Sequence, residues 1–132
     1  MKNSDVVDCI LVVDDNGANV ATYQRVISSF PDCSPLCFTS PLKALAWLAD
    51  HAPLLVVVDY RMAECDGLAL IDRCRAMPHL SRTPVVMLTG SSDDEVRTQA
   101  LRRGAVDVLM KPASREHLLS HVNRAKALRS TQ

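Results

Sequence analysis

The sequence lacks any apolar run near the roughly 20 residues that a membrane-spanning helix needs. Residues 1–7 also lack the basic region followed by an apolar one that marks a secretion signal. We therefore expect a cytoplasmic protein with no membrane segment. The chain also lacks an excess of charge of either sign, since 15 Lys and Arg balance 15 Asp and Glu. Because no net field attracts polyanions, we do not expect this chain to bind nucleic acid directly.

A complete set of soft metal ligands is also missing. The five cysteines are odd in number and accompany no secretion signal, so we expect reduced thiols that fill space as small apolar residues. Cys33 and Cys37 are close in sequence, but no second cysteine pair or nearby histidine completes a zinc site. His117 and His121 would share a helix face, yet a third ligand is not evident.

Short apolar runs recur along the chain, which at 132 residues fits one compact domain. We predict a single domain over residues 1–132, with residues 128–132 as the candidate start of a linker or tail. The clearest runs are rich in Val, Ile and Leu, as is typical of strands covered on both faces. These runs occupy residues 9–13, 54–58 and 85–88, with weaker candidates at 34–39 and 105–110.

Segments with helical spacing separate these runs. Ser40 and Pro41 form a cap followed by proline, Ser92 to Glu95 reads as a capping box, and Gly104 occupies a left-handed C-cap position. Strand and helix thus alternate five times. This order predicts an α/β fold with a single doubly wound parallel sheet, because crossovers between parallel strands are right-handed. The apolar stripes comprise Val20, Tyr23, Val26, Ile27 and Phe30; Leu68, Ile71 and Cys74; and Leu118, Val122 and Ala125.

Polar residues follow the predicted strands at the points where they end. Asp14 and Asp15 follow the first strand, and the third, fourth and fifth end at Asp59, Thr89 and Lys111. Open parallel sheets bind their ligands outside these carboxyl ends, so we expect the side chains to converge. Each carboxylate pair at 4 Å would repel by about 4 kcal/mol at an effective dielectric of 20, so the cluster calls for a cation.

Oxygen ligands with positions left for water suit Mg²⁺. A cation, a lysine and a threonine hydroxyl around one carboxylate also suit the spread negative charge of a transferring phosphoryl group. Asp59 can then act as a nucleophile and form an acyl phosphate. We therefore predict phosphoryl chemistry with Mg²⁺ at this edge of the sheet.

Several motifs together resemble the receiver domains of two-component response regulators. The resemblance implies a flavodoxin-like sheet with strand order 2-1-3-4-5. It also implies a signalling phosphoacceptor rather than an enzyme, with a sensor histidine kinase or phosphotransfer protein as phosphoryl donor. The matching pieces are ILVVDD at 10–15, LLVVVDYRM at 54–62, DGL at 66–68, VVMLTG at 85–90 and GAVDVLMKP at 104–112.

The resemblance also implies a role for each residue at the strand ends. Asp59 would be the phosphoacceptor, and Asp15 and Asp59 would bind Mg²⁺ directly together with the backbone carbonyl of Arg61. Asp14 would act through bound water and toward Lys111. Thr89 and Lys111 would each contact a phosphoryl oxygen. The peptide bond before Pro112 would be cis.

The same resemblance implies partners. An output domain or protein, or a second copy in a homodimer, would meet the surface of the fourth helix, fifth strand and fifth helix. The wording DYRM at 59–62 and NRAKALR at 123–129 resembles receivers attached to cyclic-dinucleotide phosphodiesterases of the HD-GYP type.

The sequence departs from the family pattern near the site. Val108 occupies a position that usually holds an aromatic switch residue. The family's usual coupling of Thr89 to an aromatic side chain therefore lacks its partner in this sequence. Ala63 replaces a usual proline, which predicts a looser loop after the phosphoacceptor. Arg61 and Ser91 occupy variable positions, and we hypothesise that Arg61 reaches over the phosphoryl group.

Two other functions compete with the phosphoacceptor. A pseudo-receiver would keep the fold and bind partners without phosphorylation; the acid, threonine and lysine set argues against it, while Val108 leaves room for it. A phosphatase of the haloacid dehalogenase family would need a second aspartate two residues after its nucleophile. Arg61 stands there instead, so this class is disfavoured.

Overall fold

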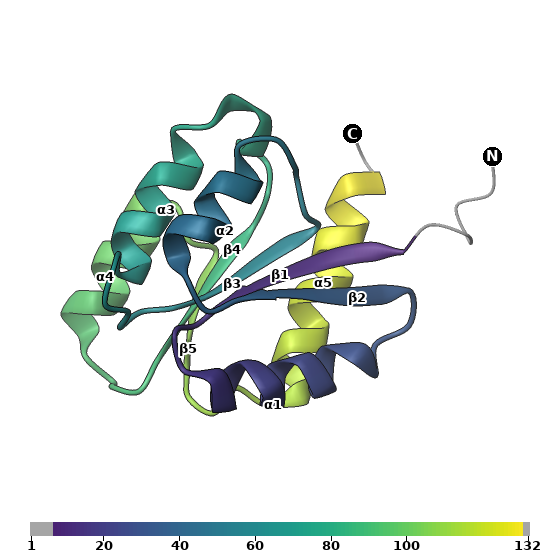
Figure 1. Cartoon of the computed structure of the whole chain (residues 1–132), viewed down its shortest axis with the longest axis horizontal. Coiled ribbons are helices and arrows are strands. Elements are labelled where there is room, and N and C mark those ends of the chain that lie inside the picture. Colours follow the sequence, from purple (N-terminus) through teal and green to yellow (C-terminus); the bar gives the residue numbers. More distant parts are fainter. Residues whose placement is uncertain (1–6, 131–132) are drawn as a thin grey trace.

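The computed structural model describes residues 7–130 and forms five parallel strands alternating with helices (Figure 1). No helix within these residues has both the length and the apolar character to cross a bilayer. The elements are β1 (Asp8–Val13), α1 (Gly17–Ser28), β2 (Cys33–Phe38), α2 (Pro41–Leu48), β3 (Leu55–Asp59), α3 (Gly67–Arg75), η2 (Pro78–Leu80), β4 (Val85–Thr89), α4 (Asp94–Arg103), β5 (Asp107–Met110) and α5 (Arg115–Ser130).

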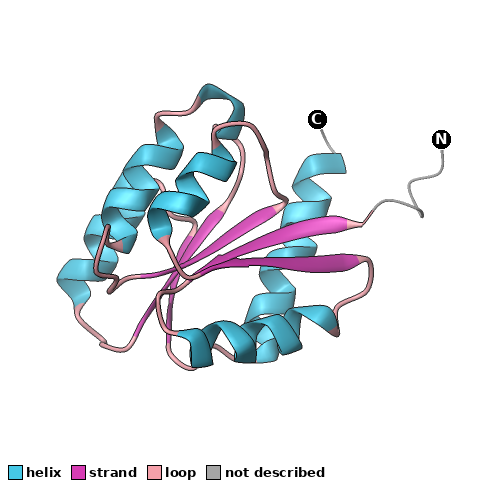
Figure 2. Cartoon of the chain, in the orientation of Figure 1, coloured by secondary structure: helices cyan, strands magenta, loops and turns pink. Residues whose placement is uncertain are grey.

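The strands lie in the order β2-β1-β3-β4-β5, and every neighbouring pair is parallel. The predicted α/β fold with a doubly wound, flavodoxin-like sheet is therefore confirmed. The chain begins near the middle of the sheet, adds β2 on one side and then builds outward on the other. This reversal sends α1 and α5 to one face and α2, α3 and α4 to the opposite face (Figure 2).

The central strands bury both of their faces, as their continuous apolar runs predicted. Alternate residues of β1 divide between the two layers: Leu11 and Val13 pack toward α2, α3 and α4, whereas Ile10 and Val12 pack toward α1 and α5. The apolar stripes of the helices supply the other half of each layer. Ile71 of α3, for example, belongs to the layer that contains Leu11. All five cysteines are unpaired, which matches the interpretation of reduced thiols.

The helix termini follow the predicted caps in two places and differ in one. Ser40 accepts a hydrogen bond from the backbone N–H of Lys43, and Gly104 takes a left-handed φ of 114° after α4. The predicted capping box from Ser92 is wrong. Asp93 caps α4 instead, accepting from Glu95 N at 2.9 Å, because its carboxylate is an equally good cap that lies one residue closer to the helix.

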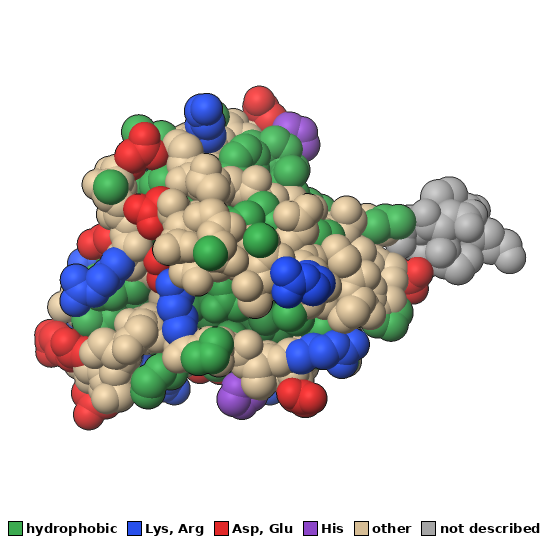
Figure 3. Space-filling model, turned by 60° about the horizontal axis from the view of Figure 1, so that its bottom comes forward, with side chains coloured by type: hydrophobic (Ala, Val, Ile, Leu, Met, Phe, Trp, Pro, Cys, Tyr) green, Lys and Arg blue, Asp and Glu red, His purple; other side chains and the backbone are tan. Residues whose placement is uncertain are grey.

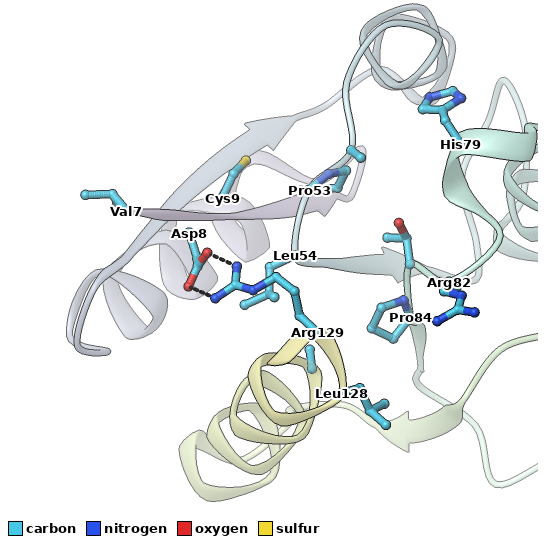
Figure 4. A pocket seen from close by; sticks show the side chains of 13 residues that line it. Val7, Asp8, Cys9, Pro53, Leu54, His79, Arg82, Pro84, Leu128 and Arg129 are labelled. Carbon is cyan, nitrogen blue, oxygen red and sulfur yellow. Dashed lines mark hydrogen bonds and ion pairs between the residues drawn. The ribbon is translucent and has the colours of Figure 1, made fainter. Parts of the chain in front are cut away.

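The end of α5 is attached to the start of β1. Arg129 forms an ion pair with the buried Asp8 through both carboxylate oxygens (Figure 4). The pair borders a pocket of about 390 Å³ at the amino ends of the strands, with Leu54 and Pro84 in its walls. Of the tail expected at residues 128–132, residues 128–130 belong to α5, and residues 131–132 lie outside the described part.

Charged side chains of both signs are interspersed on the face drawn in Figure 3, without a broad area of one sign. This distribution matches the balanced count of 15 basic and 15 acidic residues.

Gly67 lets the amino end of α3 approach the end of β3. A Cβ at this position would lie 2.7 Å from the carbonyl oxygen of Asp59 and 2.9 Å from Sδ of Met87. Gly67→Ala should therefore destabilise the fold by about 1–3 kcal/mol, as overpacking does. Urea unfolding measures this loss. Gly17→Ala is the matched control, because nothing lies within 4 Å of its Cβ; equal losses in both variants would contradict the prediction.

Candidate functional site

Three carboxylates meet at the carboxyl ends of β1 and β3. Asp14, Asp15 and Asp59 each place an oxygen within 4.8 Å of the other two. The two strands are adjacent, with Val13 paired to Val58, so their next residues emerge side by side. Asp14 and Asp59 are 2% and 6% exposed, whereas Asp15 is open to solvent. The predicted convergence of these acidic residues is present in the structure.

Lys111 reaches this cluster from the end of β5. Its Nζ lies 2.7 Å from Oδ1 of Asp59 and 3.3 Å from Oδ2 of Asp14. The backbone holds the lysine in place, since Lys111 N donates to the carbonyl of Thr89 at 2.7 Å. The bond between Lys111 and Pro112 is cis, as the family resemblance implied. One ammonium group thus offsets part of the repulsion between two buried carboxylates.

Burial and charge perturb both members of the closest pair. Burial raises the pKa of the Asp59 carboxyl; the hydrogen bond from Lys111 opposes this, and the charge of Asp14 adds to it, so the pKa lies above its usual range. Burial lowers the pKa of Lys111, but the hydrogen bond and charge of Asp59 outweigh it. The lysine therefore stays charged near neutral pH.

Thr89 ends the neighbouring strand but faces a different pocket. It is 6% exposed, and its Oγ1 accepts from Ser91 N at 3.2 Å. A pocket of about 280 Å³ above Asp59 has Arg61, Ser91 and Lys111 in its walls. Thr89 instead borders a pocket of about 270 Å³ beside Val108. The threonine is next to the cluster without lining the space directly above Asp59.

Val108, at the expected aromatic position, is part of the core and 7% exposed. Its carbonyl accepts from Nη1 of Arg97 at 2.9 Å, and Arg97 also pairs with Asp107 at 3.6 Å. Nε2 of His121 hydrogen-bonds the other oxygen of Asp107 at 2.9 Å. This network joining α4, β5 and α5 was not anticipated from the sequence, because its members are far apart in the chain and belong to no motif.

The two histidines of α5 that share a helix face have different surroundings. His121 hydrogen-bonds the carboxylate of Asp107, whereas His117 is exposed. Among residues 7–130, the acidic cluster is the group of three or more side chains arranged to hold a metal ion. Its all-oxygen donor set, partly exposed through Asp15, fits a hard divalent cation such as Mg²⁺. The arrangement can place such a cation and an ammonium group on either side of the Asp59 carboxylate.

The family model for the response regulator receiver domain matches residues 10–123, which include the acidic cluster and Lys111. The chain belongs to this family. It is 31% identical to the cyclic di-GMP phosphodiesterase response regulator RpfG of Xanthomonas campestris over 121 residues. It is 34% identical to the regulatory protein AtoC of Escherichia coli over 124 residues. These matches cover 91% and 94% of this receiver but only 32% and 26% of the two relatives.

Solved receiver domains share the fold. The receiver of an HD domain-containing protein from Pseudomonas fluorescens superposes with a TM-score of 0.84 at 24% identity, covering 96% of this chain and 99% of that one. The receiver of a sensor histidine kinase from Pseudomonas aeruginosa, solved with a magnesium ion in its active site cleft, gives 0.81 at 24% identity, covering 90% and 97%.

The raised pKa of Asp59 predicts a stability gain on removing its charge. A carboxyl with a raised folded-state pKa destabilises the fold while it is ionised; that cost shrinks as the pH falls below the raised pKa and is gone below the ordinary pKa of the unfolded chain. Asp59→Asn should therefore raise the melting temperature by a few degrees at pH 7 in EDTA. The gain should shrink toward pH 4. A lower melting temperature for the variant at pH 7 would contradict this account.

Proposed function

We propose that this receiver is a phosphoacceptor in which Asp59 accepts a phosphoryl group from a sensor histidine kinase or phosphotransfer protein. The observation that carries the proposal is the Asp59 carboxylate, which lies 2.7 Å from Lys111, within the acidic cluster and at the floor of a pocket. The family membership supports the same role.

Each residue of the site has a distinct part in the proposed transfer. An Asp59 oxygen attacks phosphorus, the bond from phosphorus to the donor's imidazole nitrogen breaks, and an acyl phosphate forms. Lys111 offsets the charge of the phosphoryl oxygens on its side. The Thr89 hydroxyl, which accepts from Ser91 N, would donate its hydrogen to a phosphoryl oxygen. Because Thr89 lines the neighbouring pocket and not the one above Asp59, Thr89 and the loop after β4 would move toward Asp59 to make this contact.

Magnesium would be held by Asp15, Asp59 and the backbone carbonyl of Arg61, with Asp14 acting through water. When bound, it supplies positive charge that stabilises the transferring phosphoryl group. The magnesium ion described for the Pseudomonas aeruginosa relative supports this assignment.

The surface of α4, β5 and α5 is the proposed output face. Its apolar side chains Leu101, Val106 and Met110 are exposed, and the Arg97 network joins its three elements. Movement of the loop after Thr89 would change the packing of this face, because Thr89 lines the same pocket as Arg97 and Val108. A second copy or an output protein would bind there. The similarity to RpfG favours control of a cyclic-dinucleotide phosphodiesterase.

Intact mass after incubation with Mg²⁺ and acetyl phosphate tests the phosphoacceptor. The parent protein should gain one phosphoryl group, and Asp59→Asn should gain none, because the amide is not a comparable nucleophile. No gain in the parent, under conditions where a known receiver reacts, would favour the pseudo-receiver.

Arg61 should lengthen the lifetime of the phosphoryl group. Its side chain borders the pocket above Asp59 and lies 5.5 Å above the Tyr60 ring centroid, so it can cover the phosphoryl group from water. Arg61→Ala should lose the phosphoryl group several-fold faster, followed by mass after removal of the donor. Arg25→Ala, on the exposed surface of α1, should match the parent. An unchanged rate in Arg61→Ala would refute this role.

A further inference from the structure

The loop between β3 and α3 is held by hydrogen bonds at its end and at its centre. At its closing end, Gly67 N donates to the carbonyl of Tyr60 at 2.8 Å, and the Asp66 carboxylate caps α3. The loop also borders a pocket of about 450 Å³ together with Asp15. The backbone of Arg61, expected to supply a metal ligand, therefore belongs to a loop that lies against the acidic cluster at Asp15.

The first central attachment joins the loop to the cluster itself. The backbone N–H of Ala63 donates to Oδ2 of Asp15 at 3.0 Å. Asp14 is buried and is held by the backbone of Asn16 at 2.9 Å and by Lys111, but Asp15 is exposed to solvent. An exposed carboxylate without a donor would sample several rotamers, and each would have to be given up when a metal binds. The Ala63 N–H restrains the cluster member with the least burial.

The second attachment joins the loop to α2. The Ser40 hydroxyl donates to Oε1 of Glu64 at 2.8 Å and accepts from Lys43 N, so it caps α2 and holds the loop at once. Ala63 and Glu64 are adjacent, so holding Glu64 against α2 limits how far the Ala63 N–H can move away from Asp15. A proline at position 63 would have no N–H to donate. The loop that was expected to be loosened by losing proline thus has a hydrogen bond that only a non-proline residue allows.

We propose that Ala63 and Glu64 are positioning residues for the divalent-cation site: Ala63 N–H orients Asp15 toward Asp14 and Asp59, and Glu64 anchors that N–H to α2. The inference rests on the proposed Mg²⁺ site and deepens it. Oxygen ligands that are held by a second layer of hydrogen bonds bind metals more tightly, and removing such a partner typically costs about 10–100-fold in affinity.

Calorimetric titration of the metal-free protein with MgCl₂ tests the Ala63 contact. Ala63→Pro, which removes the N–H, should weaken Mg²⁺ binding by about tenfold, the low end for such contacts since residue 63 is exposed. Ala63→Gly keeps the N–H and should stay close to the parent. Equal binding by Ala63→Pro and the parent, or an equal loss in both variants, would overturn the proposal.

A pair of Glu64 variants tests the anchor without a proline. Glu64→Gln and Glu64→Ala both remove the negative charge, but only the glutamine keeps an oxygen that can accept from Ser40. Glu64→Ala should therefore bind Mg²⁺ several-fold more weakly than Glu64→Gln. Equal affinities would show that the Ser40 contact does not position the site.

These outcomes separate the inference from the proposed function. If the parent protein does not bind Mg²⁺, the proposed function fails; if it binds and the Ala63 and Glu64 comparisons show no difference, only the positioning role fails. The amide NMR signal of Ala63 in metal-free protein gives a readout independent of the cation. Its exchange with solvent should accelerate in Asp15→Ala, and an unchanged rate would remove the premise.

Discussion

The ends of the central strands depend on one electrostatic constraint: two buried carboxylates must lie side by side. At an effective dielectric of 20, charges 4 Å apart repel by about 4 kcal/mol, which is large beside the stability of a small domain. Lys111 reduces this cost by pairing with both Asp14 and Asp59. Since the lysine comes from β5, the edge strand is linked by charge to β3 and β1, two and three places away in the sheet.

The proposed output face is held together differently. Only two side chains of α4, Val96 and Ala100, are buried, so this helix has a small apolar attachment. Polar contacts add to it: Arg103 bonds Asp72 on α3, and Arg97 bonds the carbonyl of Val108 on β5. Polar contacts at a surface can be exchanged for water at little net cost. A helix attached in this way can shift while the sheet beneath it keeps its packing.

The sequence predicted the sheet and the acidic cluster because both follow from local patterns. Continuous Val and Ile runs identify buried strands, and parallel strands necessarily gather their end residues. The Ala63 contact escaped prediction because a backbone N–H has no residue signature. The Arg97, Asp107 and His121 network escaped because it joins residues from three elements. At Asp93, two suitable caps stand next to each other, and sequence alone does not choose between them.

The Asp8 and Arg129 ion pair brings the first strand and the last helix together at the end of the sheet farthest from the acidic cluster. A domain whose first strand and last helix adjoin in this way can be inserted into another polypeptide as a cassette, since the host chain would enter and leave at neighbouring points. The same geometry suits circular permutation, with a linker from α5 to β1 and a new opening in a surface loop. In either arrangement the carboxyl edge of the sheet would stay accessible to a phosphoryl donor.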